Sequence, residues 1–313
     1  MAEGSDRRLV RHSTFVEDNV RWEGFEFRPD DIIISTPSKC GTTWVQMITA
    51  LLVFQSPELP APLSTLSPWL DNRFRARRDV VADLEKQAHR RFIKTHTARW
   101  GIPIVDGVTY ICAGRDPRDV ALSWDDHMAN ADIPALVSAI MAAAETDGVD
   151  LPPMPDPPPD DLDQSEQAKF WRWVLDDTPP TDVQSSLAAM LDHVQSFWDV
   201  RDGNNTVLVH YHDLVADLDS QMRSLADRLG IDVPVQRWPS LVTAASFDAM
   251  RSRPLMTIPE ADTGIWLDND AFFKKGRSGG WHEILDNGHD LRRYGDRVGA
   301  LASPELSAWI HRS

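Results

Sequence analysis

The sequence predicts an α/β fold in which helices flank a central, mostly parallel β-sheet. Short apolar runs alternate with longer helical stretches in the first half of the chain, which is typical of parallel strands joined by helical crossovers. The run "DIIIS" at 31–35 is almost entirely apolar, as expected of a strand buried on both faces. Further strands are predicted at 91–96, 108–114 and 206–211.

Helices are predicted between these strands. The helix predicted at 116–128 has a clear start, because Asp116 can cap its first turn and Pro117 occupies its first helical position. The helix before it, which follows the first strand, is marked by one apolar stripe: Trp44, Met47, Ile48, Leu51 and Leu52.

The second half of the chain continues with amphipathic helices. The segment 213–230 predicts a helix that ends at Gly230. The tail, 270–313, places a loop before a last helical stretch. Another helix is marked by five apolar residues: Val183, Leu187, Leu191, Val194 and Trp198.

One segment, 147–165, differs from the rest. It carries six prolines, six aspartates and no positive charge. We interpret it as an extended, solvated loop or lid within a single domain that spans residues 1–313, because such a composition cannot build a core.

The composition fits a soluble, cytoplasmic protein. Of 313 residues, 42% are hydrophobic and 12 are tryptophan, which allows a sizeable core. The formal net charge of −16 argues against broad nucleic-acid binding, which needs a basic face. Cys40 and Cys112 are expected to be reduced thiols. No signal peptide is expected, and no apolar run approaches the ~20 residues of a transmembrane helix.

The first candidate site is the loop "TPSKCGTTW" at 36–44. A strand that leads through small residues into a helix exposes backbone N–H groups that bind phosphate-like anions. The loop is not a Walker A motif, because Lys39 precedes the glycine and no earlier glycine is present. A tight turn with an exposed lysine explains the isolated loop equally well.

A lysine and a histidine form the second candidate. Lys94 and His96 lie two residues apart at the carboxyl end of a predicted strand, where ligands of open α/β sheets bind. An imidazole there can take a proton from a hydroxyl group. Taken alone, a structural histidine at a strand end is the better interpretation.

Two further candidates carry positive charge. Arg115 ends a strand and Ser123 follows two helical turns later, so a guanidinium and a hydroxyl group can meet one phosphate. The loop "FFKKGRSGGW" at 272–281 can clamp a phosphate as well. Charged helix caps and a solvated surface loop are the structural alternatives.

Together and in this order, these motifs resemble the sulfotransferases that use 3′-phosphoadenosine 5′-phosphosulfate (PAPS). The segments "TPSKCGTTW", "FIKTH", "YICAGRDPRDVALS", "VHYHDL" and "FFKKGRSGGW" carry the resemblance, which spans residues 30 to 285. Within the family, the chain looks most similar to cytosolic enzymes and, among these, to mycobacterial glycolipid sulfotransferases.

The resemblance implies a donor site with PAPS as the sulfonyl donor and 3′,5′-adenosine bisphosphate (PAP) as the product. Residues 39–44 would hold the 5′-phosphosulfate, with Trp44 near the adenine. Arg115 and Ser123 would hold the 3′-phosphate. The full implied donor site is Lys39, Cys40, Gly41, Thr42, Thr43, Trp44, Arg115, Ser123, Tyr211, Ser246, Lys274, Lys275 and Gly276.

The resemblance also implies catalytic roles for three residues. His96 would be the base, Lys94 would lie near the transferred group, and Lys39 would act on the bridging oxygen. Sulfonyl transfer, like phosphoryl transfer, demands alignment and charge stabilisation. Lysines supply that charge, so no metal is expected. The stretch "HEILDNGH" has the wrong spacing for a zinc site, and the pair His210 and His212 lacks a nearby third ligand.

The chain departs from the family pattern at four positions. Cys40 replaces a serine, Ala245 a threonine, Gly280 an acidic residue and His282 a lysine. The replaced lysine begins the dimer motif of the cytosolic enzymes, so the oligomeric state is not predicted.

These motifs allow three activities. The resemblance favours sulfonyl transfer to a hydroxyl group of a glycolipid or of another lipophilic alcohol or phenol, with transient membrane contact. A P-loop small-molecule kinase and a catalytically silent nucleotide-binding protein are the alternatives. The segment 63–74, the Pro/Asp segment and the region 247–270 are candidates for the acceptor mouth. Trp69, Leu70 and Phe74 would offer it apolar surface, and core packing is the alternative for them.

Overall fold

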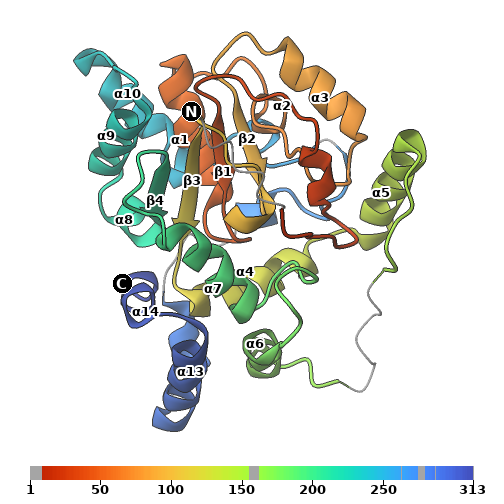
Figure 1. The fold of residues 1–313 in the computed structure, drawn as a ribbon. Coiled ribbons are helices and arrows are strands. Elements are labelled where there is room, and N and C mark those ends of the chain that lie inside the picture. The colour runs from red at the N-terminus through yellow and green to blue at the C-terminus, as the bar shows by residue number, and fades with distance from the viewer. Residues whose placement is uncertain (1–8, 155–161, 262, 274–278, 286, 313) are drawn as a thin grey trace, which may run out of the picture.

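The computed structural model describes residues 9–154, 162–261, 263–273, 279–285 and 287–312. Within these residues, a parallel sheet of four strands lies at the centre (Figure 1), in the order β2–β1–β3–β4. The strands are β1 (Ile32–Ser35), β2 (Phe92–Thr95), β3 (Thr109–Gly114) and β4 (Thr206–His210). The predicted fold class is therefore confirmed, and each predicted strand is found within one residue at either end.

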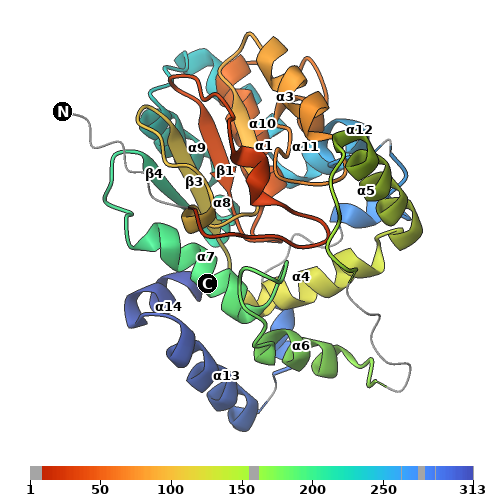
Figure 2. The ribbon, with the colours of Figure 1, turned by 45° about the vertical axis from the view of Figure 1, so that its right-hand side comes forward.

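Helices flank the sheet. Helix α1 packs against β1 and β2, and α7 packs against β3 and β4. Figure 2 shows α4 and α7 below the sheet, with α6, α13 and α14 farther from it. The helices are α1 (Thr42–Phe54), α2 (Leu63–Leu66), α3 (Arg77–Lys86), α4 (Pro117–Ala129), α5 (Ile133–Asp147), α6 (Glu166–Leu175), α7 (Leu187–Trp198), α8 (Tyr211–Ala216), α9 (Leu218–Leu229), α10 (Trp238–Ala244), α11 (Phe247–Arg251), α12 (Pro254–Thr257), α13 (Gly288–Leu301) and α14 (Pro304–Ile310).

The core forms around β1, which has a neighbouring strand on each edge. Ile32, Ile33 and Ile34 are each at most 1% exposed, so both faces of this strand are covered. Burial of these branched side chains removes apolar surface from water, which is the main favourable term in folding. A continuous apolar run was the correct signal for this central strand.

Two predicted helices differ from the observed ones because of capping residues. The helix predicted from Val183 onward begins at Leu187, where Ser186 accepts a hydrogen bond from the N–H of Ala189. The helix predicted over 213–230 is broken at Asp217, whose carboxylate caps α9. In both places a short polar side chain satisfies backbone N–H groups that the longer helix would otherwise use.

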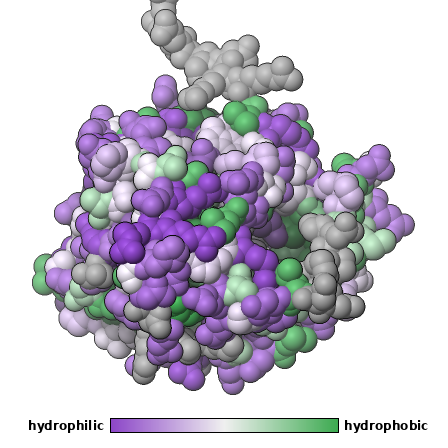
Figure 3. All heavy atoms as spheres, turned by 90° about the horizontal axis from the view of Figure 1, so that it is seen from below, coloured by the Kyte–Doolittle hydropathy of each residue, from purple (hydrophilic) through white to green (hydrophobic). Residues whose placement is uncertain are grey.

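One face of the molecule is mainly hydrophilic, in agreement with the net charge of −16 (Figure 3). Figure 3 shows a face covered by hydrophilic residues, with hydrophobic residues in small separate groups. In the part of the chain that the structure describes, every helix is too short or too polar to span a bilayer. Of the Pro/Asp segment, residues 155–161 lie outside the described residues.

A buried ion pair ties together the starts of β1 and β2. The guanidinium of Arg91 donates to both carboxylate oxygens of Asp31, at 2.9 and 2.5 Å, and to the carbonyl of Glu26 at 2.9 Å. Both charged side chains are at most 2% exposed. Breaking such a pair from one side leaves an uncompensated buried charge.

We therefore expect Arg91→Ala to lower the free energy of unfolding by about 3–5 kcal/mol, measured by urea denaturation. The matched control is Arg75→Ala, which removes an exposed ion pair with Asp83. We expect that change to cost at most about 1 kcal/mol. Equal losses in the two variants would contradict a special role for the buried pair.

Candidate active site

The carboxyl ends of the four strands carry the residues that the sequence singled out. Lys94 and His96 lie at the end of β2, Lys39 follows β1, Arg115 follows β3 and Tyr211 follows β4. Because β2, β1, β3 and β4 are neighbours in that order, these residues follow one another along one edge of the sheet. The predicted base lies at one end of the row and the predicted nucleotide-binding residues lie toward the other.

The loop between β1 and α1 has a backbone suited to anion binding. Lys39 and Gly41 have φ angles of 66° and 92°, so the chain turns sharply before α1 begins at Thr42. A Cβ atom on Gly41 would approach Cδ2 of Tyr211 to 3.0 Å, which favours glycine here. Glycine provides no capping side chain, so the first N–H groups of α1 can meet an anion.

The side chain of His96 is held by this same loop. Its Nδ1 lies 2.6 Å from the carbonyl oxygen of Thr36. A carbonyl oxygen only accepts, so Nδ1 carries the proton and Nε2 keeps a lone pair. Burial and the charge of Lys94 hold the pKa of His96 well below its usual value. The edge of His96 also meets Trp69, with ring centroids 4.6 Å apart. The imidazole is thus neutral and oriented, as a general base requires.

Two lysines bring positive charge close to this imidazole. Burial lowers the pKa of Lys94 to about 8, and Nζ lies 3.9 Å from the ring centroid of Trp69. Burial and the charges of Arg115 and Lys94 lower the pKa of Lys39 to about 7. Cations that repel one another in this way gain stability when an anion binds between them.

Aromatic rings meet at the predicted adenine end. The indole N–H of Trp44 donates to the carbonyl of Ala245 at 2.8 Å, and its ring meets Tyr211 edge-on at 5.4 Å. This contact brings Ser246 close to the same rings, although its hydroxyl group caps α11. The guanidinium of Arg115 lies 4.5 Å from the ring centroid of Tyr211 and donates to the carbonyl of Lys39.

A cleft of about 390 Å³ opens beside Arg115 and Tyr211. Its walls include Asp119, which accepts hydrogen bonds from the N–H of Gly279, and His282. The cleft is large enough for a nucleotide. The predicted donor-binding residues Lys274, Lys275 and Gly276 lie outside the described residues.

The remaining predicted residues are placed as follows. Ser123 is half-buried in α4, two turns after the helix begins. Thr42 and Thr43 begin α1, and the hydroxyl of Thr42 lies 2.5 Å from that of Thr36. Cys40 is 1% exposed, and its sulfur accepts a hydrogen bond from the backbone N–H of Arg115, so the thiol belongs to the core.

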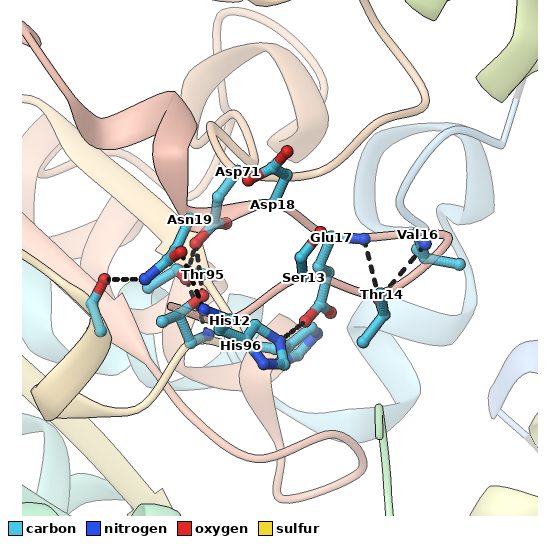
Figure 4. A network of polar contacts seen from close by, with 12 residues as sticks. His12, Ser13, Thr14, Val16, Glu17, Asp18, Asn19, Asp71, Thr95 and His96 are labelled. Atoms are coloured by element: carbon cyan, nitrogen blue, oxygen red, sulfur yellow. Dashed lines mark hydrogen bonds and ion pairs between the residues drawn. The ribbon is translucent and has the colours of Figure 1, made fainter. Parts of the chain in front are cut away.

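The N-terminal segment packs against the end of β2, which the motifs did not indicate (Figure 4). Oδ2 of Asp71 accepts three hydrogen bonds, from the indole of Trp22 and the hydroxyl groups of Thr95 and Thr97, at 2.6 to 2.8 Å. This buried carboxylate anchors the chain on both sides of His96.

Sequence reasoning also missed His127. Its Nδ1 lies 3.4 Å from Nζ of Lys39, and its ring meets Trp266 at 4.8 Å between centroids. His127 follows Ser123 by four residues on α4, so both lie on one helical face. That spacing was the available signal.

Some residues of the candidate acceptor mouth lie at the candidate site, and one lies in the core. Trp69 and Phe74 are half-buried and meet edge-on at 6.0 Å, and Trp69 contacts both Lys94 and His96. Leu70 is fully buried and belongs to the core. Among the described residues, no group of three or more His, Cys, Asp or Glu side chains is arranged to hold a metal ion.

Known proteins are similar to this chain over most of its length. The sulfotransferase domain family matches residues 29–296. Glycolipid sulfotransferases of Mycobacterium bovis and of Mycobacterium tuberculosis H37Rv are each 39% identical, over 98% of this chain and 95% of their own length. Cytosolic sulfotransferase 1 of Danio rerio is 27% identical, over 87% of this chain and 82% of its own.

Solved structures share the fold. Retinol dehydratase in complex with retinol and PAP superposes with a TM-score of 0.67 at 17% identity, covering 90% of this chain and 84% of that chain. A mouse sulfotransferase complexed with PAP gives a TM-score of 0.63 at 19% identity, covering 92% and 90%. The family match excludes the kinase alternative. The chain belongs to the sulfotransferase family and is a PAPS-dependent sulfotransferase.

Proposed function

We propose that the chain works in the cytoplasm and transfers the sulfonyl group of PAPS to a hydroxyl group of a glycolipid. The acceptor is suggested by the relatives that are 39% identical and are named glycolipid sulfotransferases. Half-buried Trp69 and Phe74 near the base offer apolar surface to the acceptor. An enzyme with a lipid-linked acceptor and no spanning helix among its described residues would meet the membrane surface transiently.

The observation that carries the mechanism is the hydrogen bond from Nδ1–H of His96 to the carbonyl of Thr36. Since Nδ1 carries the proton, the lone pair of Nε2 would be left for the acceptor, and His96 contacts the loop that would bind the donor. His96 takes the proton of the acceptor hydroxyl as the new S–O bond forms. A base positioned in this way contributes ~10²–10⁴-fold to the rate.

Lysines would stabilise the charge that develops on the departing group. As the bond between sulfur and the bridging oxygen breaks, the electron pair stays on that oxygen, and PAP leaves. Lys39 would donate to this oxygen and Lys94 to the oxygens of the transferring group. One preorganised donor of this kind is worth about 3–4 kcal/mol.

The other end of the donor would be held at the far end of the sheet. Arg115 and Ser123 would bind the 3′-phosphate, and the paired rings of Trp44 and Tyr211 would offer an aromatic surface to the adenine. Binding energy from this remote end fixes the sulfonyl group in line with the acceptor.

The base assignment predicts that His96→Ala lowers kcat by ~10²–10⁴-fold while PAP binding changes little. Turnover is measured with saturating PAPS, and PAP binding by calorimetry. The control is His289→Ala, since His289 is exposed on α13. Turnover at the unchanged rate in the His96 variant would show that another group takes the proton.

The lowered pKa of Lys39 predicts that PAP binding takes up a proton above pH 7. With a pKa of about 7, Lys39 is mostly deprotonated at pH 8, and the bound phosphate favours its charged form. Affinity should therefore fall as pH rises through 7 to 9, by up to about tenfold per unit for each linked proton.

Calorimetry at pH 8 in Tris and in HEPES, which differ in ionisation enthalpy, measures this uptake. Lys39→Arg should lower it, because guanidinium stays protonated at this pH. Equal uptake in the variant and the unchanged protein would assign the proton to another group.

The acceptor class is tested by transfer of radiolabelled sulfate from PAPS. The protein is offered a mycobacterial lipid extract and, in parallel, a panel of small phenols. We expect label in a glycolipid fraction, and more label there than in any phenol. Label in phenols alone would overturn the glycolipid proposal and leave sulfonyl transfer intact.

A further inference from the structure

A second, narrow cleft, with about 30 Å³ of enclosed space, lies beside His96 and has several polar groups in its walls. His12 and Glu17 come from the N-terminal segment, and Gln184 and Ser185 come from the chain before α7. The acceptor hydroxyl must reach His96, so the part of the acceptor next to that hydroxyl faces these groups. An entirely apolar acceptor would strip water from them without replacing its hydrogen bonds, which is costly.

Glu17 is the most firmly placed of these groups. Its residue is 2% exposed, and Oε2 accepts a hydrogen bond from Nε2 of His12 at 2.9 Å. The backbone N–H donates to Oγ1 of Thr14 at 3.0 Å, and a β-bridge joins Glu17 to Asn72. Figure 4 shows the side chains of His12, Glu17 and His96 converging.

The second carboxylate oxygen of Glu17 has no such partner. Among the described residues, no donor makes a hydrogen bond with Oε1. Glu17 also lies within electrostatic reach of Lys94, which the mechanism places at the transferring group. A buried carboxylate oxygen beside the reaction centre is thus available to a hydroxyl group of the acceptor.

We propose that Glu17 accepts a hydrogen bond from a second hydroxyl group of the acceptor, close to the one that is sulfated. This contact selects acceptors whose reacting end is a polyhydroxylated ring such as a sugar. The inference rests on the proposed function, because it describes the reacting end of the glycolipid. His12 positions Glu17, and Nδ1 of His12 is in turn fixed by the carbonyl of Thr181 at 2.9 Å.

The test compares Glu17→Met with the unchanged protein on two acceptors. Methionine has a similar length and no oxygen atom. Octyl β-glucoside offers several hydroxyl groups and 2-naphthol offers one. We expect the variant to lose about 10- to 100-fold in kcat/KM for the glucoside, the usual worth of a hydrogen bond to a charged group, and little for 2-naphthol. Glu23→Met, at an exposed position of the same segment, is the control.

Deoxygenated acceptors give a second measurement that does not need the variant. In the unchanged protein, a monodeoxy glucoside that lacks the contacted hydroxyl should lose the same factor. The Glu17→Met protein should not distinguish this deoxy compound from the parent glucoside, because the partner on the enzyme is already gone.

Several results would overturn the inference. Equal losses on the glucoside and on 2-naphthol would mean that Glu17 only supports the fold. If the unchanged protein had the same kcat/KM for every deoxygenated glucoside as for the parent compound, the enzyme would not recognise a second hydroxyl group. Turnover of 2-naphthol without the glucoside would overturn the sugar preference alone, whereas turnover of neither would count against the proposed function itself.

Discussion

The hydrogen bond between Nδ1–H of His96 and the carbonyl of Thr36 is the contact on which the site depends. It joins the end of β2 to the first residue of the loop after β1. The hydroxyl group of Thr36 also contacts that of Thr42 at the start of α1. Thr36 therefore connects the base to the loop that would bind the anion. Their relative position is therefore set by two paired strands, and such rigid elements hold catalytic groups more precisely than mobile loops do.

The fold followed from local sequence patterns where those patterns had few alternatives. A nearly continuous apolar run can only be a strand or helix that is covered on all sides, and its short length selected the strand. The helix boundaries depended on single polar residues: Ser186 begins α7 later than its apolar stripe suggests, and Asp217 divides α8 from α9. A stripe of apolar residues does not reveal which neighbouring hydroxyl or carboxylate will cap a helix.

Part of the candidate donor site was predictable, because Lys39, Arg115 and Tyr211 each lie within a few residues of a strand end. Parallel strands end at one edge of the sheet, which brings these residues together, whereas the nucleotide role of Tyr211 is only what the resemblance to sulfotransferases implies. The position of the residues on the other side of His96 was not predictable, because Glu17 and Asp71 reach it through contacts between segments far apart in the chain. The segment that holds Glu17 has no helical or strand periodicity, so only tertiary packing could show where its carboxylate lies.

The burial of both cysteines has a practical consequence. Cys40 lies in the donor loop, yet its side chain is enclosed and burial raises the pKa of its thiol to about 12. Cys112, in the centre of β3, is fully enclosed as well. Thiolates react with maleimides and haloacetamides, whereas shielded, protonated thiols react slowly. The chain can therefore serve as an almost cysteine-free background, in which one cysteine placed on the surface would accept a fluorophore or spin label for following donor binding.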